Sequence, residues 1–375
     1  MARLDTSNTL LAATETPESV GVESSELVVR WPGGEELRRR TIWLRDNCSC
    51  PGCAHPGTGE RLLDTAQLPG RPAAESVRAD GAEIEVVWSD GHVSRYSADV
   101  FQRRGRPPSR RTLWGSELAD RLPEARHEDL VTRDSTLREW LSAVDELGFA
   151  IARGAPASEG EVLRFVELFG HVKETNYGRL FDVRSVVNPN NLAYTGLALG
   201  PHTDNPYRDP PPTLQLLHCI SSSAAGGEST LVDGLAVAEA LRARSPEGFE
   251  LLTRHPVTFR FRDAATELEA EAPVLELDLH GDVRWIRYST RAVRAFDLPE
   301  DAVEPYYDAY RAFGRMLADP AFQISFKLDP GDLFIVDNRR VLHGRTGYEG
   351  EGTRHLQGAY ADVDGLRSRL AVLSR

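Results

Sequence analysis

The chain has 375 residues, 41% of them hydrophobic and 27% charged, a composition ordinary for a globular protein and a length that suggests two domains. Its formal net charge of −13 argues against nucleic acid and against anionic membrane surfaces as partners, because both need clustered Lys and Arg. It has no run of about eighteen apolar residues, so no transmembrane helix is expected. Its N-terminus lacks the features of a signal peptide, so a cytoplasmic location is expected.

The N-terminal region predicts a small β-rich unit. Residues 24–47 and 83–101 carry short strand patterns, and the SDG sequence between EIEVVW and HVSRY is typical of a hairpin turn. We therefore assign residues 1–107 to a β-rich N-terminal domain and expect residues 1–23 to be flexible.

A different pattern begins near Ser135, after a charged stretch at 108–135 that has little periodicity and is predicted to be a linker. Apolar residues at helical spacing predict a helix that Gly148 ends, and the GFAIARG sequence after it predicts a strand. A second amphipathic helix is expected around residues 162–169.

Many strand-like runs follow, interrupted by helical stretches near 235–254 and 302–318. The runs are LQLLHCI, STLVDG, VTFRF, VLELDL, VRWIRY, FQISFKL, DLFIVDN and HLQGAYADV. Strands with few intervening helices favour an antiparallel sandwich or barrel over a βαβ sheet, so residues 136–375 are predicted to form a mainly β domain with helices.

Three of the four cysteines, Cys48, Cys50 and Cys53, lie within six residues. In a cytoplasmic protein such a cluster more often binds metal than forms disulfides. A structural Zn(II) site needs a fourth ligand to complete its tetrahedral set. His92, in the predicted hairpin, is the best candidate, whereas His55 is so close to Cys53 that its chelate would be strained. Three reduced cysteines in a loop without metal are the alternative.

The sequence His202-Thr203-Asp204 offers a metal-binding pair, because residues two apart on a strand point to the same face. His343, after DLFIVDNRRVL, supplies a second histidine from a distant strand. Two histidines and one carboxylate form the facial triad that holds Fe(II) and leaves adjacent positions open. These positions suit a bidentate 2-oxo acid and dioxygen. A solvent-facing His-x-Asp pair is the alternative.

Arg354 follows His343 by eleven residues. We expect the two to lie on a strand pair joined by the turn GYEGEG, which would bring Arg354 close to the metal. Its planar fork suits the distal carboxylate of 2-oxoglutarate. A surface salt bridge is the alternative role for this arginine.

Longer motifs connect these residues to a known family. HTDNP, LQLLHCI, GGESTLVDG, DNRRVLHGR and GTRHLQGAYADVD together resemble the γ-butyrobetaine and trimethyllysine hydroxylases, within the taurine-dioxygenase-like oxygenases. The resemblance implies a double-stranded β-helix (jelly-roll) domain, a structural zinc domain built on Cys-x-Cys-x-x-Cys and a later His, and usually a homodimer. The iron triad and Arg354 keep their roles, and Ser229 and Asn191 are added as candidates for cofactor binding.

The family holds a trimethylammonium group in a cage of aromatic rings, through cation–π attraction. Tyr177, Tyr194 and Tyr360 match the cage positions of the butyrobetaine hydroxylases, and Phe181 stands where the family has Trp. The alternative is that these aromatic residues only pack in the core.

The acid end of the substrate site departs from the family pattern. Asn205 replaces a residue that is usually Tyr, and Ser289 and Thr290 lie where paired asparagines are usual, with Arg287 nearby. We assign Asn205, Arg287 and Ser289 to substrate binding, and the departures suggest a differently placed carboxylate or a phosphonate.

The predicted activity is Fe(II)- and 2-oxoglutarate-dependent hydroxylation of a quaternary ammonium substrate. γ-Butyrobetaine, which would give L-carnitine, is the leading candidate, and 2-trimethylaminoethylphosphonate and trimethyllysine are alternatives. A jelly-roll metal hydrolase would not need Arg354, and a non-catalytic binding protein would be expected to lose a triad ligand.

Overall fold

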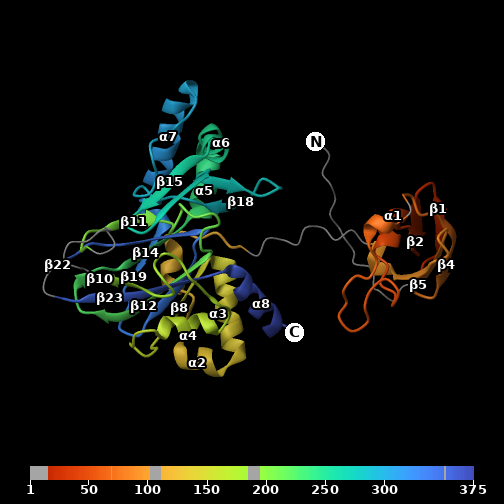
Figure 1. Ribbon diagram of the computed structural model, residues 1–375, viewed down its shortest axis with the longest axis horizontal. Helices are drawn as coiled ribbons and strands as arrows, with labels where there is room; N and C mark the ends of the chain where they lie inside the picture. The colour runs from red at the N-terminus through yellow and green to blue at the C-terminus, as the bar shows by residue number, and fades with distance from the viewer. Residues whose placement is uncertain (1–15, 69, 102–110, 185–194, 350–351) are drawn as a thin grey trace. The chain divides into compact units, whose positions relative to one another are not determined.

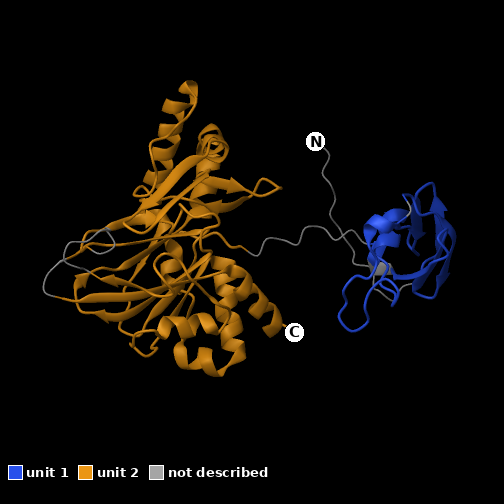
Figure 2. Ribbon diagram, in the orientation of Figure 1, with its two compact units in different colours: residues 1–108 blue, residues 109–375 orange. Residues whose placement is uncertain are grey.

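The computed structural model describes most of the chain (Figure 1). The described segments are residues 16–68, 70–101, 111–184, 195–349 and 352–375. They belong to two compact units, residues 1–108 and residues 109–375 (Figure 2). Among the described helices, none combines the length and the apolar character that crossing a membrane requires.

The first unit consists of two antiparallel three-stranded sheets. Their strands are β1 (Ser19–Glu23), β2 (Glu26–Arg30) and β3 (Glu36–Arg40), and β4 (Ala74–Asp80), β5 (Glu83–Trp88) and β6 (Val93–Ser97). Side chains from both sheets bury one small core around Trp31 and Trp88. The predicted SDG turn joins β5 to β6, which confirms the expected hairpin.

Two expectations for this unit were wrong. Residues 19–23, expected to be flexible, form β1, because β2 offers them a full antiparallel register. Residues Thr41–Asp46, within a stretch predicted as strand, form the short helix α1. The helical turn buries both Leu44 and the neighbouring Arg45, which the alternating faces of a strand would separate.

The second unit is a sandwich of two antiparallel-rich sheets. The larger has the order β10-β23-β12-β20-β8-β7, with β9 beside β23, and the smaller has the order β11-β21-β14-β19. The larger sheet comprises β7 (Glu124–Arg126), β8 (Phe149–Arg153), β9 (Val172–Lys173), β10 (Phe181–Arg184), β12 (Leu214–Ser222), β20 (Leu333–Asp337) and β23 (Arg354–Ala361). The smaller comprises β11 (Leu199–His202), β14 (Ser229–Asp233), β19 (Gln323–Phe326) and β21 (Val341–Arg345). This architecture confirms the predicted jelly-roll domain.

One core holds the two sheets of the sandwich together. Its buried side chains come from β8, β12, β20 and β23 on one side and from β14, β19 and β21 on the other, so the inner faces of the sheets meet. Leu217 and Phe334 of the larger sheet pack with Leu231 and Phe326 of the smaller. The strands of both sheets therefore present alternate side chains to a shared interior, where the cavity described below also opens.

Helices cover the outer face of the larger sheet. They are α2 (His127–Thr132), α3 (Asp134–Leu147), α4 (Glu161–Glu167) and α8 (Val363–Leu373). The predicted stop of α3 is confirmed, because Gly148 takes the left-handed conformation, with φ of 85°. A side chain there would also collide with Val341. The sequence analysis missed α8, in which only Leu366 and Leu370 are buried.

An insertion between β14 and β19 carries the predicted helical stretches. It contains α5 (Gly234–Arg244), α6 (Pro246–Arg254) and α7 (Glu300–Leu317), with the hairpins β15 (Val257–Arg262)–β16 (Glu267–Ala272) and β17 (Leu275–Leu277)–β18 (Val283–Ile286). These elements share a separate core around Phe259 and Tyr306, and they stand together at one side of the sandwich (Figure 1).

The stretch 108–135, predicted as a linker, is folded wherever the structure describes it. It forms a 3₁₀ turn at Ser116–Arg121, then β7, which pairs with β8, and then α2. Trp114 and Leu118 enter the core between the sheets, and Arg340 donates to the carbonyl of Thr112. A few apolar anchors thus fix a segment whose overall composition is polar.

Candidate functional site

Three candidate iron ligands meet near the edge of the smaller sheet, where β11 pairs with β21. His202 ends β11, and His343 lies opposite it in the middle of β21, so the strand register makes the two histidines neighbours. Their ring centroids are 4.4 Å apart. Asp204 Oδ1 lies 3.5 Å from His202 Nε2 and 3.8 Å from His343 Nε2. One ligand atom from each residue lies within 4.8 Å of the others, which is close enough for one metal ion.

Asp204 reaches this position by a different route from the one expected. The strand ends at His202, so the two residues do not share a strand face, and the chain turns at Asn205, whose φ is 51°. Asn338 holds the turn in place, because its side chain accepts from the Asp204 N–H at 2.7 Å and donates to the Asp204 carbonyl at 2.9 Å. Asn338 is fully buried, and the sequence analysis missed it within the DNRRVLHGR motif.

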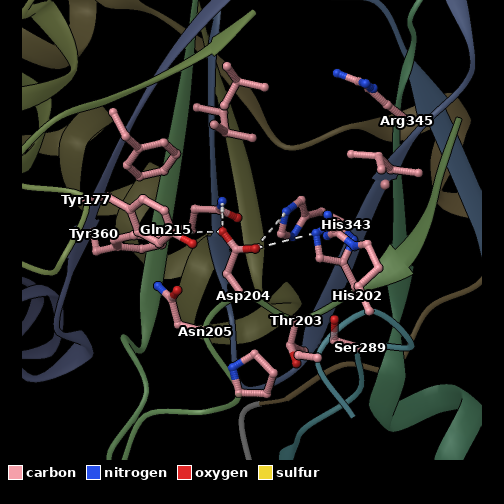
Figure 3. A pocket seen from close by; sticks show the side chains of 18 of the residues that line it. Tyr177, His202, Thr203, Asp204, Asn205, Gln215, Ser289, His343, Arg345 and Tyr360 are labelled. Atoms are coloured by element: carbon pink, nitrogen blue, oxygen red, sulfur yellow. Dashed lines mark hydrogen bonds and ion pairs between the residues drawn. The ribbon is translucent and has the colours of Figure 1, made fainter. Parts of the chain in front are cut away.

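The hydrogen bonds around the triad prepare it for a cation. His202 Nδ1 lies 3.0 Å from the Gly200 carbonyl, so the ring donates there and keeps the Nε2 lone pair for a metal. Tyr360 donates its hydroxyl to Asp204 Oδ2 at 2.7 Å, and Gln215 donates to the same oxygen, so Oδ1 remains for the metal (Figure 3). Two histidines and one carboxylate arranged in this way fit Fe(II).

The electrostatics of the triad favour an ionised Asp204 carboxylate and a neutral His343 ring. Burial raises the pKa of Asp204, but the neighbouring His202 and His343 outweigh burial, so the pKa lies well below its usual value. Burial, followed by the neighbouring His202, lowers the pKa of His343 to about 3. Burial also holds the pKa of Tyr360 well above its usual value, so the phenol keeps the proton that it donates to Asp204.

A cavity of about 400 Å³ opens beside the triad. Its lining includes most of the predicted site residues, namely Tyr177, Phe181, His202, Asp204, Asn205, Ser229, Ser289, His343, Arg354 and Tyr360. Thr290 and Arg287 are not among the lining residues, and Asn191 and Tyr194 lie outside the described residues. Residues distant in sequence therefore surround one space next to the candidate metal ligands.

Arg287 has a different place from the one expected of a substrate-binding residue. It is buried behind the loop that follows Asp204 and donates to the Arg208 carbonyl at 3.2 Å and to the exposed Asp209 carboxylate at 3.3 Å. Its guanidinium therefore holds that loop from outside the cavity. The RWIRYSTR sequence places the arginine near the site but does not reveal the side from which it acts.

Arg354 lines the cavity at the start of β23. The expectation that its strand pairs with the strand of His343 was wrong. β21 and β23 belong to opposite sheets, and Arg354 reaches the cavity across the sandwich. Its Nε donates to the Gly227 carbonyl at 3.1 Å. Burial and then the nearby Arg345 lower the pKa of Arg354 to about 10, so it stays charged at neutral pH. Two buried guanidinium groups side by side suit a carboxylate ligand.

Five aromatic rings form an arc along the other side of the cavity. Phe181 stacks on Tyr360 with centroids 4.9 Å apart and lies 6.1 Å from Tyr177. Tyr177 lies 5.7 Å from Phe261, which stacks on Tyr207 at 5.1 Å. The sequence analysis missed Phe261 and Tyr207, although one lies in the VTFRF strand and the other directly follows HTDNP. Ring faces placed in this way can hold a cation that has no hydrogen-bond donors.

The first unit contains the second metal-binding cluster. The Sγ atoms of Cys48, Cys50 and Cys53 lie 3.3, 3.5 and 3.6 Å from His92 Nε2. Tetrahedral zinc with ordinary Zn–S and Zn–N bonds would place these atoms about 3.5 Å apart. His55 instead accepts the backbone N–H groups of residues 57 and 58 at its Nδ1. The four predicted ligands therefore converge in the geometry of a closed structural zinc site.

A buried arginine supports the cysteine cluster. Arg45 Nη1 lies 3.5 Å from Cys53 Sγ, and its Nε donates to Asp90 Oδ2 at 2.9 Å. Asp90 in turn accepts the backbone N–H of His92 at 3.1 Å. Because three thiolates and Zn(II) carry a net negative charge, the guanidinium balances the site and links both halves of the ligand set.

Comparison with known proteins gives matches to both units. Residues 109–360 match the Taurine catabolism dioxygenase TauD, TfdA family, and residues 19–102 match Gamma-butyrobetaine hydroxylase-like, N-terminal. A gamma-butyrobetaine dioxygenase of Pseudomonas sp. (strain AK-1) is 37% identical and covers 94% of both chains. The gamma-butyrobetaine dioxygenase of Homo sapiens is 34% identical, over 92% of this chain and 93% of the relative. A trimethyllysine dioxygenase of Meyerozyma guilliermondii is 29% identical over the same shares.

Proposed function

The chain belongs to the TauD, TfdA family of dioxygenases, and from this membership we propose that it hydroxylates a trimethylammonium acid, with γ-butyrobetaine as the leading candidate. Relatives named for γ-butyrobetaine and for trimethyllysine support this class of substrate. The observation that carries the proposal is the aromatic arc, because Tyr360 belongs to it and also donates to Asp204. A cation held by these rings would lie next to the candidate iron ligands.

The residues of the cavity have separable roles in this proposal. Fe(II), held by His202, Asp204 and His343, supplies the oxidation of a substrate C–H bond by dioxygen, coupled to conversion of 2-oxoglutarate to succinate and carbon dioxide. Arg354, together with Ser229, binds the distal carboxylate of 2-oxoglutarate. The rings hold the quaternary ammonium group and exclude water from the bound substrate. The zinc cluster lies in the other unit and supplies folding energy.

Replacing Arg354 by alanine should chiefly raise the apparent KM for 2-oxoglutarate. Removal of one partner of a buried charge pair costs about 2–5 kcal/mol, which corresponds to a roughly thirtyfold or greater increase. The measurement is succinate release at varied 2-oxoglutarate with saturating γ-butyrobetaine. Arg367→Ala is the control, because this exposed arginine pairs with Asp145 and does not line the cavity. An unchanged KM in Arg354→Ala would show that another residue binds the distal carboxylate of 2-oxoglutarate.

γ-Butyrobetaine should bind more tightly than 5,5-dimethylhexanoate, in which carbon replaces the quaternary nitrogen. The two acids have nearly the same shape, so the difference reports the attraction between the cation and the rings of Tyr177, Phe181 and Tyr360. We expect a difference of about 1–3 kcal/mol, or roughly tenfold to hundredfold in Kd. Competition assays of succinate release measure it. Equal affinities would show that the rings are only apolar walls and would end the trimethylammonium proposal.

The alternative substrates differ at the acid end. Asn205 and Ser289 line the cavity, and neither is the residue usual in butyrobetaine hydroxylases, so 2-trimethylaminoethylphosphonate and trimethyllysine remain candidates. A metal hydrolase would have no use for the buried Arg354, and the intact triad speaks against a purely binding function. A homodimeric assembly and a cytoplasmic location stay predictions.

A further inference from the structure

A tyrosine behind the cavity wall lies against both of the buried guanidinium groups beside the triad. The ring centroid of Tyr348 is 5.9 Å from Arg354 Cζ and 5.1 Å from Arg345 Cζ. A cation within about 6 Å of an aromatic face is attracted by the ring. Both arginines line the cavity, whereas Tyr348 is not among the lining residues, so its ring acts on them from behind. One ring therefore helps to hold two like charges next to each other.

A glycine holds Arg354 from a second direction. The Nε of Arg354 donates to the Gly227 carbonyl at 3.1 Å. Gly227 has a φ of 71°, and a Cβ atom there would lie 3.0 Å from Arg354 Cδ and 3.4 Å from Tyr348 Cδ1. Glycine at this position therefore lets the arginine and the ring approach the same turn of the backbone. The carbonyl and the ring together restrain one guanidinium group.

The backbone of the tyrosine is fixed by its neighbours. β22 (Tyr348–Glu349) pairs with β13 (Ala225–Gly226), the strand that directly precedes Gly227. The Tyr348 N–H donates to the Gly196 carbonyl at 3.0 Å, and a side chain at Gly196 would lie only 2.8 Å from the Tyr348 carbonyl oxygen. These contacts are made within the chain, so the ring is in place before a co-substrate binds.

The part of Arg354 that remains for a ligand is the end of its fork. Neither Nη atom has a hydrogen-bond partner among the described residues, and no described carboxylate forms an ion pair with this arginine. A buried charge without a counter-ion is costly, so an anion is expected when the site is filled. Because Nε is taken by a carbonyl, a carboxylate that binds bidentately has to bind end-on, to the two Nη atoms.

The restrained guanidinium sets the length of acid that the site accepts. Figure 3 shows Arg345 on the other side of the triad from Tyr177 and Tyr360, so the arginines are separate from the cation-binding rings. A 2-oxo acid has to span the fixed distance between the triad and the end of Arg354. We propose that Tyr348 is a positioning residue whose ring holds Arg354 in place, so that the site selects its 2-oxo acid by chain length. The inference rests on the proposed function, which requires 2-oxoglutarate.

The test compares 2-oxoglutarate with 2-oxoadipate, which is longer by one methylene group. Both dissociation constants are measured calorimetrically on the Fe(II)-loaded full chain, without dioxygen and without γ-butyrobetaine. The wild type should prefer 2-oxoglutarate by about tenfold or more, the effect of one misplaced methylene group. Tyr348→Leu removes the ring and should raise the Kd of 2-oxoglutarate by about twofold to thirtyfold. The Kd of 2-oxoadipate should rise less, because a released guanidinium can withdraw to meet the longer acid.

Tyr348→Phe separates the ring from the hydroxyl group, and it should behave as the wild type because it keeps the aromatic face. Tyr307→Leu is the matched control, because this tyrosine of α7 is 45% exposed and does not line the cavity. Tyr348→Met repeats the test with another flexible side chain if Tyr348→Leu does not fold. In turnover, Tyr348→Leu should raise the KM for 2-oxoglutarate and leave the KM for γ-butyrobetaine unchanged.

The same measurements can overturn the proposal. If Tyr348→Leu weakens both acids equally, or weakens neither, the ring does not position Arg354. An equal loss of preference in Tyr348→Phe would assign the effect to the hydroxyl group. Equal binding of the two acids by the wild type would refute selection by length while leaving a 2-oxo acid as the co-substrate. A wild type that binds neither acid would overturn the proposed function and this inference together.

Discussion

Replacing His202 or Asp204 by alanine should abolish substrate-dependent turnover of 2-oxoglutarate while leaving the fold intact. Mutation of residues that merely support metal ligands typically costs about 10–100-fold, so loss of a ligand should exceed that range. Asp204 is central to the site, since its Oδ1 faces both histidines and its Oδ2 accepts from Tyr360 and Gln215. The measurement is succinate release at saturating Fe(II), with iron binding followed by anaerobic titration.

The control for this experiment is His280→Ala, an exposed histidine in the turn between β17 and β18. It should retain wild-type activity and iron affinity. Thermal unfolding of each variant shows whether the fold persists. This control is needed because a variant that is inactive only because it is unfolded would not test the role of His202 or Asp204. Full activity in His202→Ala or Asp204→Ala would remove the triad assignment.

The sequence predicted the three candidate iron ligands that the structure brings together, but not the way in which the chain holds them. Ligand identity follows from residue chemistry and order, whereas ligand position depends on neighbours that are distant in sequence. Asp204 lies beyond the end of its strand and is clamped by Asn338, 134 residues away. Tyr207 and Phe261 join the arc because β15 folds back beside the loop after Asp204, which short patterns cannot reveal.

The fold was predictable where hydrophobic periodicity and a stop residue agree. The helix before Gly148 and the strand after it fit expectation, because burial and backbone conformation favour the same boundary. Prediction failed where a few buried residues anchor a polar segment. β7 forms because it pairs with β8. The segment around Trp114 is held in place because this side chain packs in the core between the two sheets. Such tertiary contacts override local composition.

Zinc binding should govern the stability of the first unit. Among its described residues, the main core contains nine buried hydrophobic residues, a small number for a unit of this length. Binding of structural zinc is worth about 10–16 kcal/mol in small metal-dependent domains, whereas a whole domain is stable by about 5–15 kcal/mol. Loss of the zinc should therefore unfold the first unit, while the second unit, which contains the triad, stays folded.

His92→Gln should lose zinc, whereas His55→Gln should keep it. Both histidines follow the cysteines in sequence. His92 Nε2 lies 3.3 Å from Cys48 Sγ, whereas the exposed His55 accepts backbone N–H groups. Metal analysis of the purified full chain should find about one zinc in wild type and in His55→Gln. Calorimetry should show an unfolding transition missing or lowered only in His92→Gln, with turnover per folded second unit changed far less. Zinc retained in His92→Gln, or absent from active wild type, would contradict the Cys₃His site.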